Sequence, residues 1–212
     1  MRFECASIVP ASNKTLLIVE DDPALRSYLA SALGDQGYVV QQAHDRATAM
    51  ACLTSDSPPG LVLLDLGLPP APSTMAEGLA VLDECLRNAP ATKVIVLTGQ
   101  DERAAALEAV RRGAFDFLVK PAAVATIIQA LHRAELFARE EVRMAEAGEA
   151  RVQLTARLDE GPKEVGAAAE EQLLRRALAE TGYNIAETGR RLGLAREHVY
   201  YYLNKYGIRR PG

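Results

Sequence analysis

Four short apolar segments recur along the first two thirds of the chain, each about as long as one β-strand. They are rich in Val, Ile and Leu and are continuous rather than alternating: TLLIVE (15–20), LVLLD (61–65), KVIVLT (93–98) and FDFLVK (115–120). Continuous apolar segments of this length are typical of strands that are buried on both faces of a parallel sheet. A weaker segment, YVVQQA (38–43), predicts an edge strand.

Helical segments with start and stop signals separate these strands. Pro23 lies in the first turn of a helix that we expect to end before Gly37. Asp45 and Asp101 each precede a helical segment as N-cap residues, and AEGLAVLDECLRN (76–88) supplies another helix. This alternation of strand and helix up to about residue 135 predicts a doubly wound α/β domain.

The rest of the chain has a helical pattern. The pattern of residues 121–158 predicts one long helix or two. Phe137, Met144 and Leu158 fall on a seven-residue spacing there, but Arg151 occupies the apolar position between the last two. A dimerising coiled coil and a solvated linker helix fit this pattern about equally well. EGPKEVG predicts a break, and a short all-helical segment follows it. We therefore expect a first domain, a helical linker that could dimerise and a small helical domain, over residues 14–137, 138–166 and 167–212.

Polar residues end all four of the strong strands. In chain order they are Glu20 with Asp21, Asp65, Thr98 and Lys120. Because the carboxyl ends of parallel strands meet at one edge of the sheet, we expect these side chains in one crevice. Crowded carboxylates repel unless a cation neutralises them, and an all-oxygen ligand set without His or Cys favours Mg²⁺.

Asp65 is the predicted nucleophile of this crevice. It ends the central strand and precedes a proline-rich loop, PPAPSTMAEG. A carboxylate beside Mg²⁺ and a lysine is suited to accept a phosphoryl group. Thr98 and Lys120 then remain to receive the anion.

The motifs IVEDDPALR, LVLLDLGLP, VIVLTG and FDFLVKP, in this order and spacing, resemble the receiver domain of two-component response regulators. The resemblance covers roughly residues 14–137 and implies a five-stranded parallel sheet of order 2-1-3-4-5. It also implies that Asp65 accepts a phosphoryl group from a histidine kinase. By the same resemblance Mg²⁺ would be bound by Asp21, Asp65 and the backbone carbonyl of Gly67, with Glu20 acting through water.

The resemblance also implies roles for the remaining strand-end residues. Thr98 and Lys120 would hold the phosphoryl oxygens, and the Lys120–Pro121 bond is expected to be cis. Phe117 matches the aromatic residue that moves inward with Thr98 on activation, although a plain core phenylalanine is an equal alternative.

The sequence departs from this family at the loop after Asp65. The loop is longer than usual and places Gly78 about five residues late, which would alter kinase docking on this face. Gly67 and Gln100 occupy the two positions that tune the lifetime of the phosphoryl group. Gly67 offers no side chain that could order an attacking water, whereas Gln100 does, so we expect a moderately long-lived phosphoryl state.

The last part of the chain carries a basic excess. From residue 170 onward eight Lys and Arg stand against five acids, giving +3, so the net charge of −4 leaves −7 for residues 1–169. IAETGRRL and AREHVYYYLNKYG predict two short helices joined by a turn at Gly193, as in a helix-turn-helix. On the second helix Val199, Leu203 and Tyr206 share the predicted core face, while Tyr201 lies opposite.

This segment resembles the Fis-type helix-turn-helix of bacterial regulators over residues 170–208. The positions that match DNA-contacting residues are Arg196, His198, Tyr200 and Tyr201. Relatives commonly have Arg or Lys where this chain has Tyr201 and Tyr202. A small helical dimerisation module is the alternative for this segment.

Composition narrows the class of protein. Trp is absent and aromatic residues are 5% of the 212 residues, which disfavours a carbohydrate-binding or aromatic-cage protein. Cys5, Cys52 and Cys85 have no metal or disulfide spacing, which fits a reducing compartment. No apolar stretch approaches the ~20 residues of a membrane helix, so we expect a cytoplasmic protein without membrane contact. The sequence contains no GxxxxGK[ST] loop, so we expect no ATPase in it.

These observations predict a transcription regulator that is switched by phosphorylation of Asp65, requires Mg²⁺, binds DNA and acts as a homodimer. Its only expected catalysis is its own phosphorylation from a phosphodonor and its own dephosphorylation. One alternative is a phosphohydrolase with an aspartyl nucleophile, although such enzymes typically carry a DxD motif on one strand end. The other is a phosphorylation-dependent adaptor whose tail dimerises or binds protein.

Overall fold

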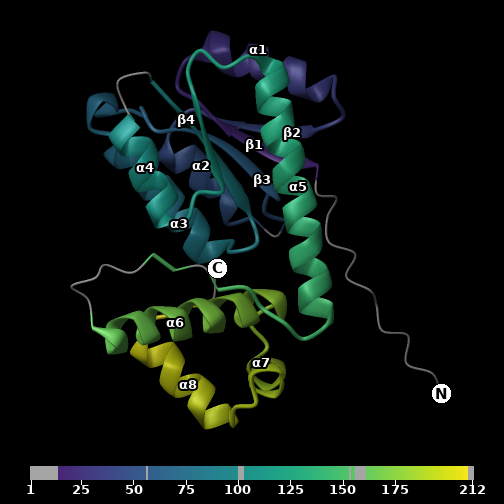
Figure 1. Ribbon diagram of the computed structural model, residues 1–212, viewed down its shortest axis with the longest axis vertical. Helices are drawn as coiled ribbons and strands as arrows, with labels where there is room; N and C mark the ends of the chain where they lie inside the picture. The colour runs from purple at the N-terminus through teal and green to yellow at the C-terminus, as the bar shows by residue number, and fades with distance from the viewer. Residues whose placement is uncertain (1–13, 56, 100–102, 153, 156–160, 210–212) are drawn as a thin grey trace, which may run out of the picture.

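Five parallel strands form one sheet in the order β2-β1-β3-β4-β5 (Figure 1). The computed structural model describes residues 14–209, except 56, 100–102, 153 and 156–160. The strands are β1 (Thr15–Val19), β2 (Val39–Ala43), β3 (Leu61–Asp65), β4 (Lys93–Thr98) and β5 (Asp116–Val119). The predicted doubly wound fold and its strand order are thus confirmed, with the expected edge strand β2 beside β1.

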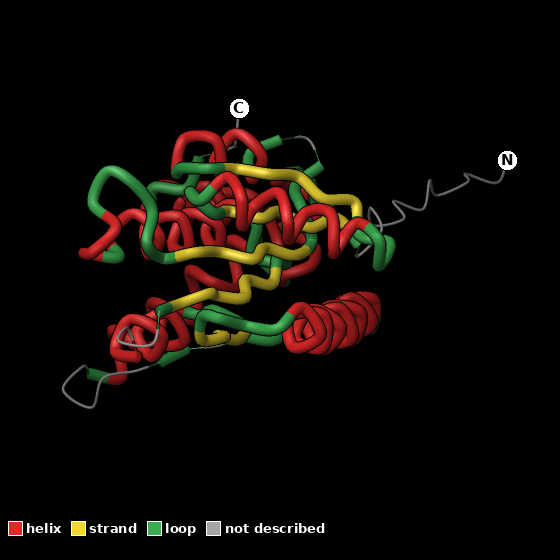
Figure 2. The backbone as a smooth tube through the Cα atoms, turned by 90° about the horizontal axis from the view of Figure 1, so that it is seen from above, coloured by secondary structure: helices red, strands yellow, loops and turns green. Residues whose placement is uncertain are grey.

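Helices cover both faces of the sheet (Figures 1 and 2). They are α1 (Pro23–Gly34), α2 (Arg46–Leu53), α3 (Ala76–Asn88), α4 (Arg103–Arg112) and α5 (Val124–Glu146). Alternate residues of the central strands point to opposite faces. Leu17, Val62 and Val94 pack in the core under α2, α3 and α4. Leu16, Leu61 and Ile95 pack in the core under α1 and α5.

Two of the helix starts follow from side-chain capping. The Asp22 carboxylate accepts hydrogen bonds from the amides of Ala24 (2.8 Å) and Leu25 (3.2 Å) at the start of α1. Asp45 and Thr48 form a capping box at the start of α2, as expected for Asp45. The predicted N-cap residue Asp101 lies outside the described residues.

Within residues 138–166, predicted as a helical linker, the structure describes helix only at the two ends. α5 ends at Glu146, because Gly148 takes a left-handed conformation (φ +78°) and the Glu149 amide donates to the Met144 carbonyl at 2.8 Å. This is the Schellman pattern that stops a helix. The next helix, α6 (Pro162–Glu180), begins inside the expected break, with proline in its first turn.

The predicted coiled-coil spacing is not used as a helical seam. Arg151 lies beyond α5, and Leu158 lies outside the described residues. Phe137 instead packs within its own chain: its ring centroid lies 5.4 Å from that of Phe115. The Arg151 guanidinium lies 4.6 Å from the same ring.

Three helices form the C-terminal unit: α6, α7 (Ile185–Leu192) and α8 (Arg196–Lys205). Leu174, Leu178, Val199 and Ile208 form its small core. α6 lies between the α/β domain and the pair α7–α8 (Figure 1). Within the described ranges of the chain, the structure has no helix long and apolar enough to cross a bilayer.

Candidate functional site

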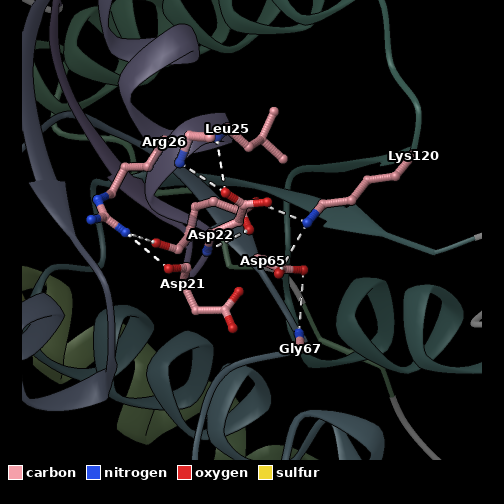
Figure 3. Close-up of polar contacts among 9 residues, drawn as sticks. Asp21, Asp22, Leu25, Arg26, Asp65, Gly67 and Lys120 are labelled. Carbon is pink, nitrogen blue, oxygen red and sulfur yellow. Dashed lines mark hydrogen bonds and ion pairs between the residues drawn. The ribbon is translucent and has the colours of Figure 1, made fainter.

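Three of the predicted strand-end residues lie close together at one edge of the sheet: Asp21, Asp65 and Lys120 (Figure 3). Glu20 and Asp21 follow β1, Asp65 is the last residue of β3, and Lys120 follows β5. The Lys120 ammonium lies 2.8 Å from Glu20 Oε2 and 3.0 Å from Asp65 Oδ2. Residues one hundred positions apart therefore form one charged cluster, as the strand pattern predicts.

The fold gives the three consecutive acids after β1 different environments. Glu20 is buried, with 2% of its surface exposed, and its carboxylate faces Lys120. Asp21 is exposed to solvent beside it. Asp22 is occupied as the cap of α1, so its carboxylate is directed to the helix amides. Only the first two acids therefore remain for the cluster.

Burial and the neighbouring charges have opposing effects on the pKa values of this cluster. Burial raises the pKa of Glu20, and the Asp65 carboxylate adds to this effect, while the hydrogen bond from Lys120 opposes it. Burial lowers the pKa of Lys120, but its hydrogen bonds and charge contacts with Glu20 and Asp65 outweigh burial, so the net pKa is raised. Lys120 therefore stays charged and is the local counterion of both carboxylates.

The donor set fits a hard divalent cation. Carboxylate oxygens of Glu20, Asp21 and Asp65 lie within 4.8 Å of one another. Three carboxylates and one ammonium leave a formal charge of −2, which one divalent cation neutralises. All the donors are oxygens, and Asp21 is open to solvent, which suits a Mg²⁺ ion that keeps several of its waters.

The long loop after β3 is held at both of its ends. The Gly67 amide donates to Asp65 Oδ1 at 3.3 Å, and Leu68 is fully buried. A short 3₁₀ turn, η1 (Pro72–Thr74), precedes α3. The loop therefore bulges between two fixed points, Leu68 and the first turn of α3.

Other predicted site residues have the following positions. Thr98 is fully buried at the end of β4, and its side chain donates to the Gly99 carbonyl at 3.4 Å. Phe117 is half-buried and packs against the core under α2, α3 and α4. The Lys120–Pro121 bond is cis, as expected. Gln100 lies outside the described residues, and the switching and lifetime roles of these positions stay predictions.

Arg26 belongs to the site, although the sequence reasoning did not single it out. Its Nη1 donates to the backbone carbonyls of Glu20 (2.6 Å) and Asp21 (3.2 Å) (Figure 3). The available signal was its spacing, because it lies one helical turn after the capping Asp22.

The second candidate site is the surface of α8. The α7–α8 turn is tight: a Cβ at Gly189 would lie 2.8 Å from the Leu194 carbonyl oxygen, and Gly193 has φ +65°. Val199 is fully buried, and Leu203 and Tyr206 pack beside it, as expected. Tyr200 and Tyr201 are 46% and 60% exposed, and Arg196 and His198 are exposed as well. All four predicted DNA-contacting positions therefore face solvent.

Comparisons with known proteins agree with the fold and with the presence of two domains. Residues 16–132 match the response regulator receiver domain, and residues 167–206 match the bacterial regulatory proteins of the Fis family. The receiver match spans more than half of the chain. The chain therefore belongs to the response regulators, with a receiver domain and a Fis-type helix-turn-helix.

The curated relatives with similar sequences are regulatory proteins. The nitrogen assimilation regulatory protein NtrX of Azorhizobium caulinodans is 34% identical over 106 residues, which are 50% of this chain and 22% of that protein. The acid tolerance regulatory protein ActR of Rhizobium meliloti is 37% identical over 56% of this chain and 58% of its own length. The C4-dicarboxylate transport regulator DctD of Rhizobium meliloti is 27% identical over 93% of this chain and 41% of its own length. The chain thus spans less than two thirds of each of these relatives.

Solved structures show the same domain. The receiver domain of NtrX from Brucella abortus matches with a TM-score of 0.53 and 33% identity, over 57% of this chain and 98% of that one. A longer NtrX structure from the same organism, in complex with ADP, matches 77% of this chain and 34% of its own length with a TM-score of 0.58 and 28% identity.

Proposed function

We propose that this response regulator accepts a phosphoryl group on Asp65 from a histidine kinase and thereby changes how its tail binds DNA. The supporting observation is the 3.0 Å contact between the Lys120 ammonium and Asp65 Oδ2, beside the carboxylates of Glu20 and Asp21. A nucleophilic carboxylate, a cation site and a fixed ammonium are the parts that phosphoryl transfer needs.

The transfer itself requires little covalent chemistry from the protein. A carboxylate oxygen of Asp65 forms the new P–O bond while the P–N bond of a phosphohistidine breaks, and the electron pair of that bond stays on the imidazole nitrogen. Lys120 stays charged and contacts Asp65, so it meets the phosphoryl oxygens as charge develops on them. Asp21, Asp65 and the Gly67 carbonyl would hold Mg²⁺, with Glu20 acting through water, and this ion would supply the remaining positive charge.

The phosphoryl group adds about two negative charges at Asp65. We propose that Thr98 and Phe117 respond to it, since Thr98 is buried at the neighbouring strand end and Phe117 packs into the adjacent core. A near-complete switch needs about 5.5 kcal/mol of differential stabilisation between the two states. Gly67 and Gln100 are the proposed determinants of the phosphoryl lifetime.

The tail is the proposed DNA-binding unit. We propose that α8 is the recognition helix, which contacts base edges in the major groove. Its exposed side chains include Arg196, His198, Tyr200 and Tyr201. Arg190 and Arg209 are exposed nearby and can contact phosphates. A homodimer would present two such helices to half-sites about 34 Å apart.

One gel-shift series tests both steps. Wild type and Asp65→Ala are each compared on the cognate promoter DNA, with and without acetyl phosphate and Mg²⁺. We expect the phosphodonor to change the affinity of the wild type alone, and added salt to weaken DNA retention steeply because phosphate contacts release counterions. Weak retention that is insensitive to salt contradicts DNA binding and favours a protein-binding adaptor.

A further inference from the structure

Arg26 bridges the first turns of α1 to the main chain of the acidic segment. It is the fourth residue of α1 and is half-buried. Its Nη1 atom donates to two consecutive carbonyl oxygens, those of Glu20 at 2.6 Å and Asp21 at 3.2 Å (Figure 3). Both residues supply carboxylates to the candidate cation site.

The acidic segment has few other restraints on its main chain. β1 ends at Val19, and the Glu20 amide still donates to the Ala43 carbonyl of β2 at 3.1 Å. The Asp22 amide donates to Glu20 Oε1 at a long 3.4 Å. The two carbonyls that Arg26 binds follow the last residue of β1, and the Glu20 amide makes the last hydrogen bond to the sheet that the described residues show in this segment. Arg26 therefore restrains the part of the backbone that directs the Glu20 and Asp21 side chains.

The contact leaves the carboxylates themselves available. In the part of the chain that the structure describes, Arg26 forms no ion pair within 4.0 Å, and its two side-chain hydrogen bonds end on carbonyl oxygens. Arg26 therefore restrains the main chain of Glu20 and Asp21 and leaves their carboxylate oxygens available to a cation. Its charge still lies close to the site, and by Coulomb's law alone that charge repels a second cation.

We propose that Arg26 is a positioning residue of the divalent-cation site, which fixes the main chain of Glu20 and Asp21 so that their carboxylates face Asp65. This inference rests on the proposed function of that site. The positioning role and the charge of Arg26 predict opposite changes in Mg²⁺ affinity when its side chain is replaced. Loss of positioning weakens cation binding, whereas loss of a nearby positive charge strengthens it.

The test is a calorimetric titration of the full chain with MgCl₂, at fixed ionic strength, for wild type, Arg26→Gln and Arg26→Lys. Arg143→Gln is the matched control, because Arg143 is 73% exposed near the far end of α5, where it pairs with Glu140. We expect Arg26→Gln to weaken Mg²⁺ binding about tenfold, as loss of partners that orient metal ligands typically does. Arg26→Lys should recover part of this loss, and Arg143→Gln should stay within about twofold of wild type.

The Mg²⁺ dependence of the phosphorylation rate is a second readout, which would not change if Arg26 only stabilised the fold. For phosphorylation by acetyl phosphate, Arg26→Gln should raise the Mg²⁺ concentration for half-maximal rate and leave the rate at saturating Mg²⁺ near that of wild type. Thermal unfolding without Mg²⁺ shows whether each variant is folded. If Arg26→Gln does not fold, the comparison of Arg26→Lys with wild type is the test. Unchanged or tighter Mg²⁺ binding by the folded Arg26 variants overturns the inference. Absence of Mg²⁺ binding by the wild type overturns the cation site of the proposed function as well.

Discussion

Gly78 lies directly on the backbone of Leu66: a Cβ at position 78 would be 2.4 Å from the Leu66 Cα. Gly78 is in the first turn of α3, and Leu66 follows β3. This contact fixes the start of α3 to the end of β3 beside Asp65. The loop after β3, which we predicted to be about five residues longer than usual, therefore leaves this contact in place.

Gly78→Ala should destabilise the protein by about 3 kcal/mol, because backbone atoms cannot yield to the new methyl group as a flexible side chain could. Gly34→Ala is the matched control, since a Cβ there has nothing within 4 Å and the residue is also helical. We expect that control to be neutral or stabilising by up to about 1 kcal/mol. Urea unfolding of both variants measures the difference, and equal stabilities of the two variants would show that the close approach is absent.

A buried ion pair links the start of β4 to the end of α5. Lys93 Nζ lies 2.6 Å from Glu141 Oε2, and both side chains are nearly inaccessible. Burial lowers the pKa of Lys93, while the Glu141 contact raises it. Glu141→Gln should therefore cost about 3 kcal/mol of unfolding free energy, since it leaves a buried ammonium without its counterion.

The double variant Lys93→Met with Glu141→Leu is the control for this pair. It should recover most of the loss, because well-packed apolar residues can replace a buried pair. A Glu141→Gln variant as stable as wild type would show that the pair is solvated in solution.

Glu170 provides a pH-dependent contact between α6 and α8. Hydrogen bonds from Lys205 and Tyr206 lower its pKa from the usual 4.5 to about 2. Because the folded pKa is lowered, the stabilisation is fully present above pH 4.5 and is lost as the pH falls toward 2. The difference in melting temperature between wild type and Glu170→Gln should thus be constant above about pH 5 and shrink on acidification. A difference that grows at low pH contradicts this contact.

The described cysteines should differ in reactivity. Cys85 is fully buried, and burial raises its pKa to about 12, whereas Cys52 is half-buried. Since the thiolate is the reactive species, iodoacetamide at neutral pH should label Cys52 before Cys85. Mass spectrometry of digested protein measures both rates. Urea should abolish the difference, and rapid native labelling of Cys85 would contradict its burial.

The sequence predicts the receiver fold well because each central strand is a continuous apolar segment. Leu61–Leu64 are all fully buried or nearly so, as expected for a strand covered on both faces. The same pattern places Asp65 and Lys120 at the strand ends, and parallel topology then brings them together. The face of α8 that carries Val199 also follows directly from helical spacing.

The features that the sequence did not reveal depend on tertiary contacts. The heptad spacing of Phe137 and Met144 left a dimerising seam and a solvated linker helix about equally open, whereas in the structure Phe137 packs on Phe115 and Gly148 ends the helix. Periodicity cannot distinguish a face that packs on its own chain from one that packs on another. Arg26 was missed because its partners are backbone carbonyls, so the sequence carried no signal for it beyond its position one helical turn after Asp22.

The most direct test of the account is intact-protein and peptide mass spectrometry after incubation with acetyl phosphate. With Mg²⁺, the wild type should gain one phosphoryl group, and the modified peptide should contain Asp65. Asp65→Asn and Mg²⁺-depleted wild type should gain none. No gain by the wild type with Mg²⁺, or a gain at another residue that persists in Asp65→Asn, would contradict the central claim.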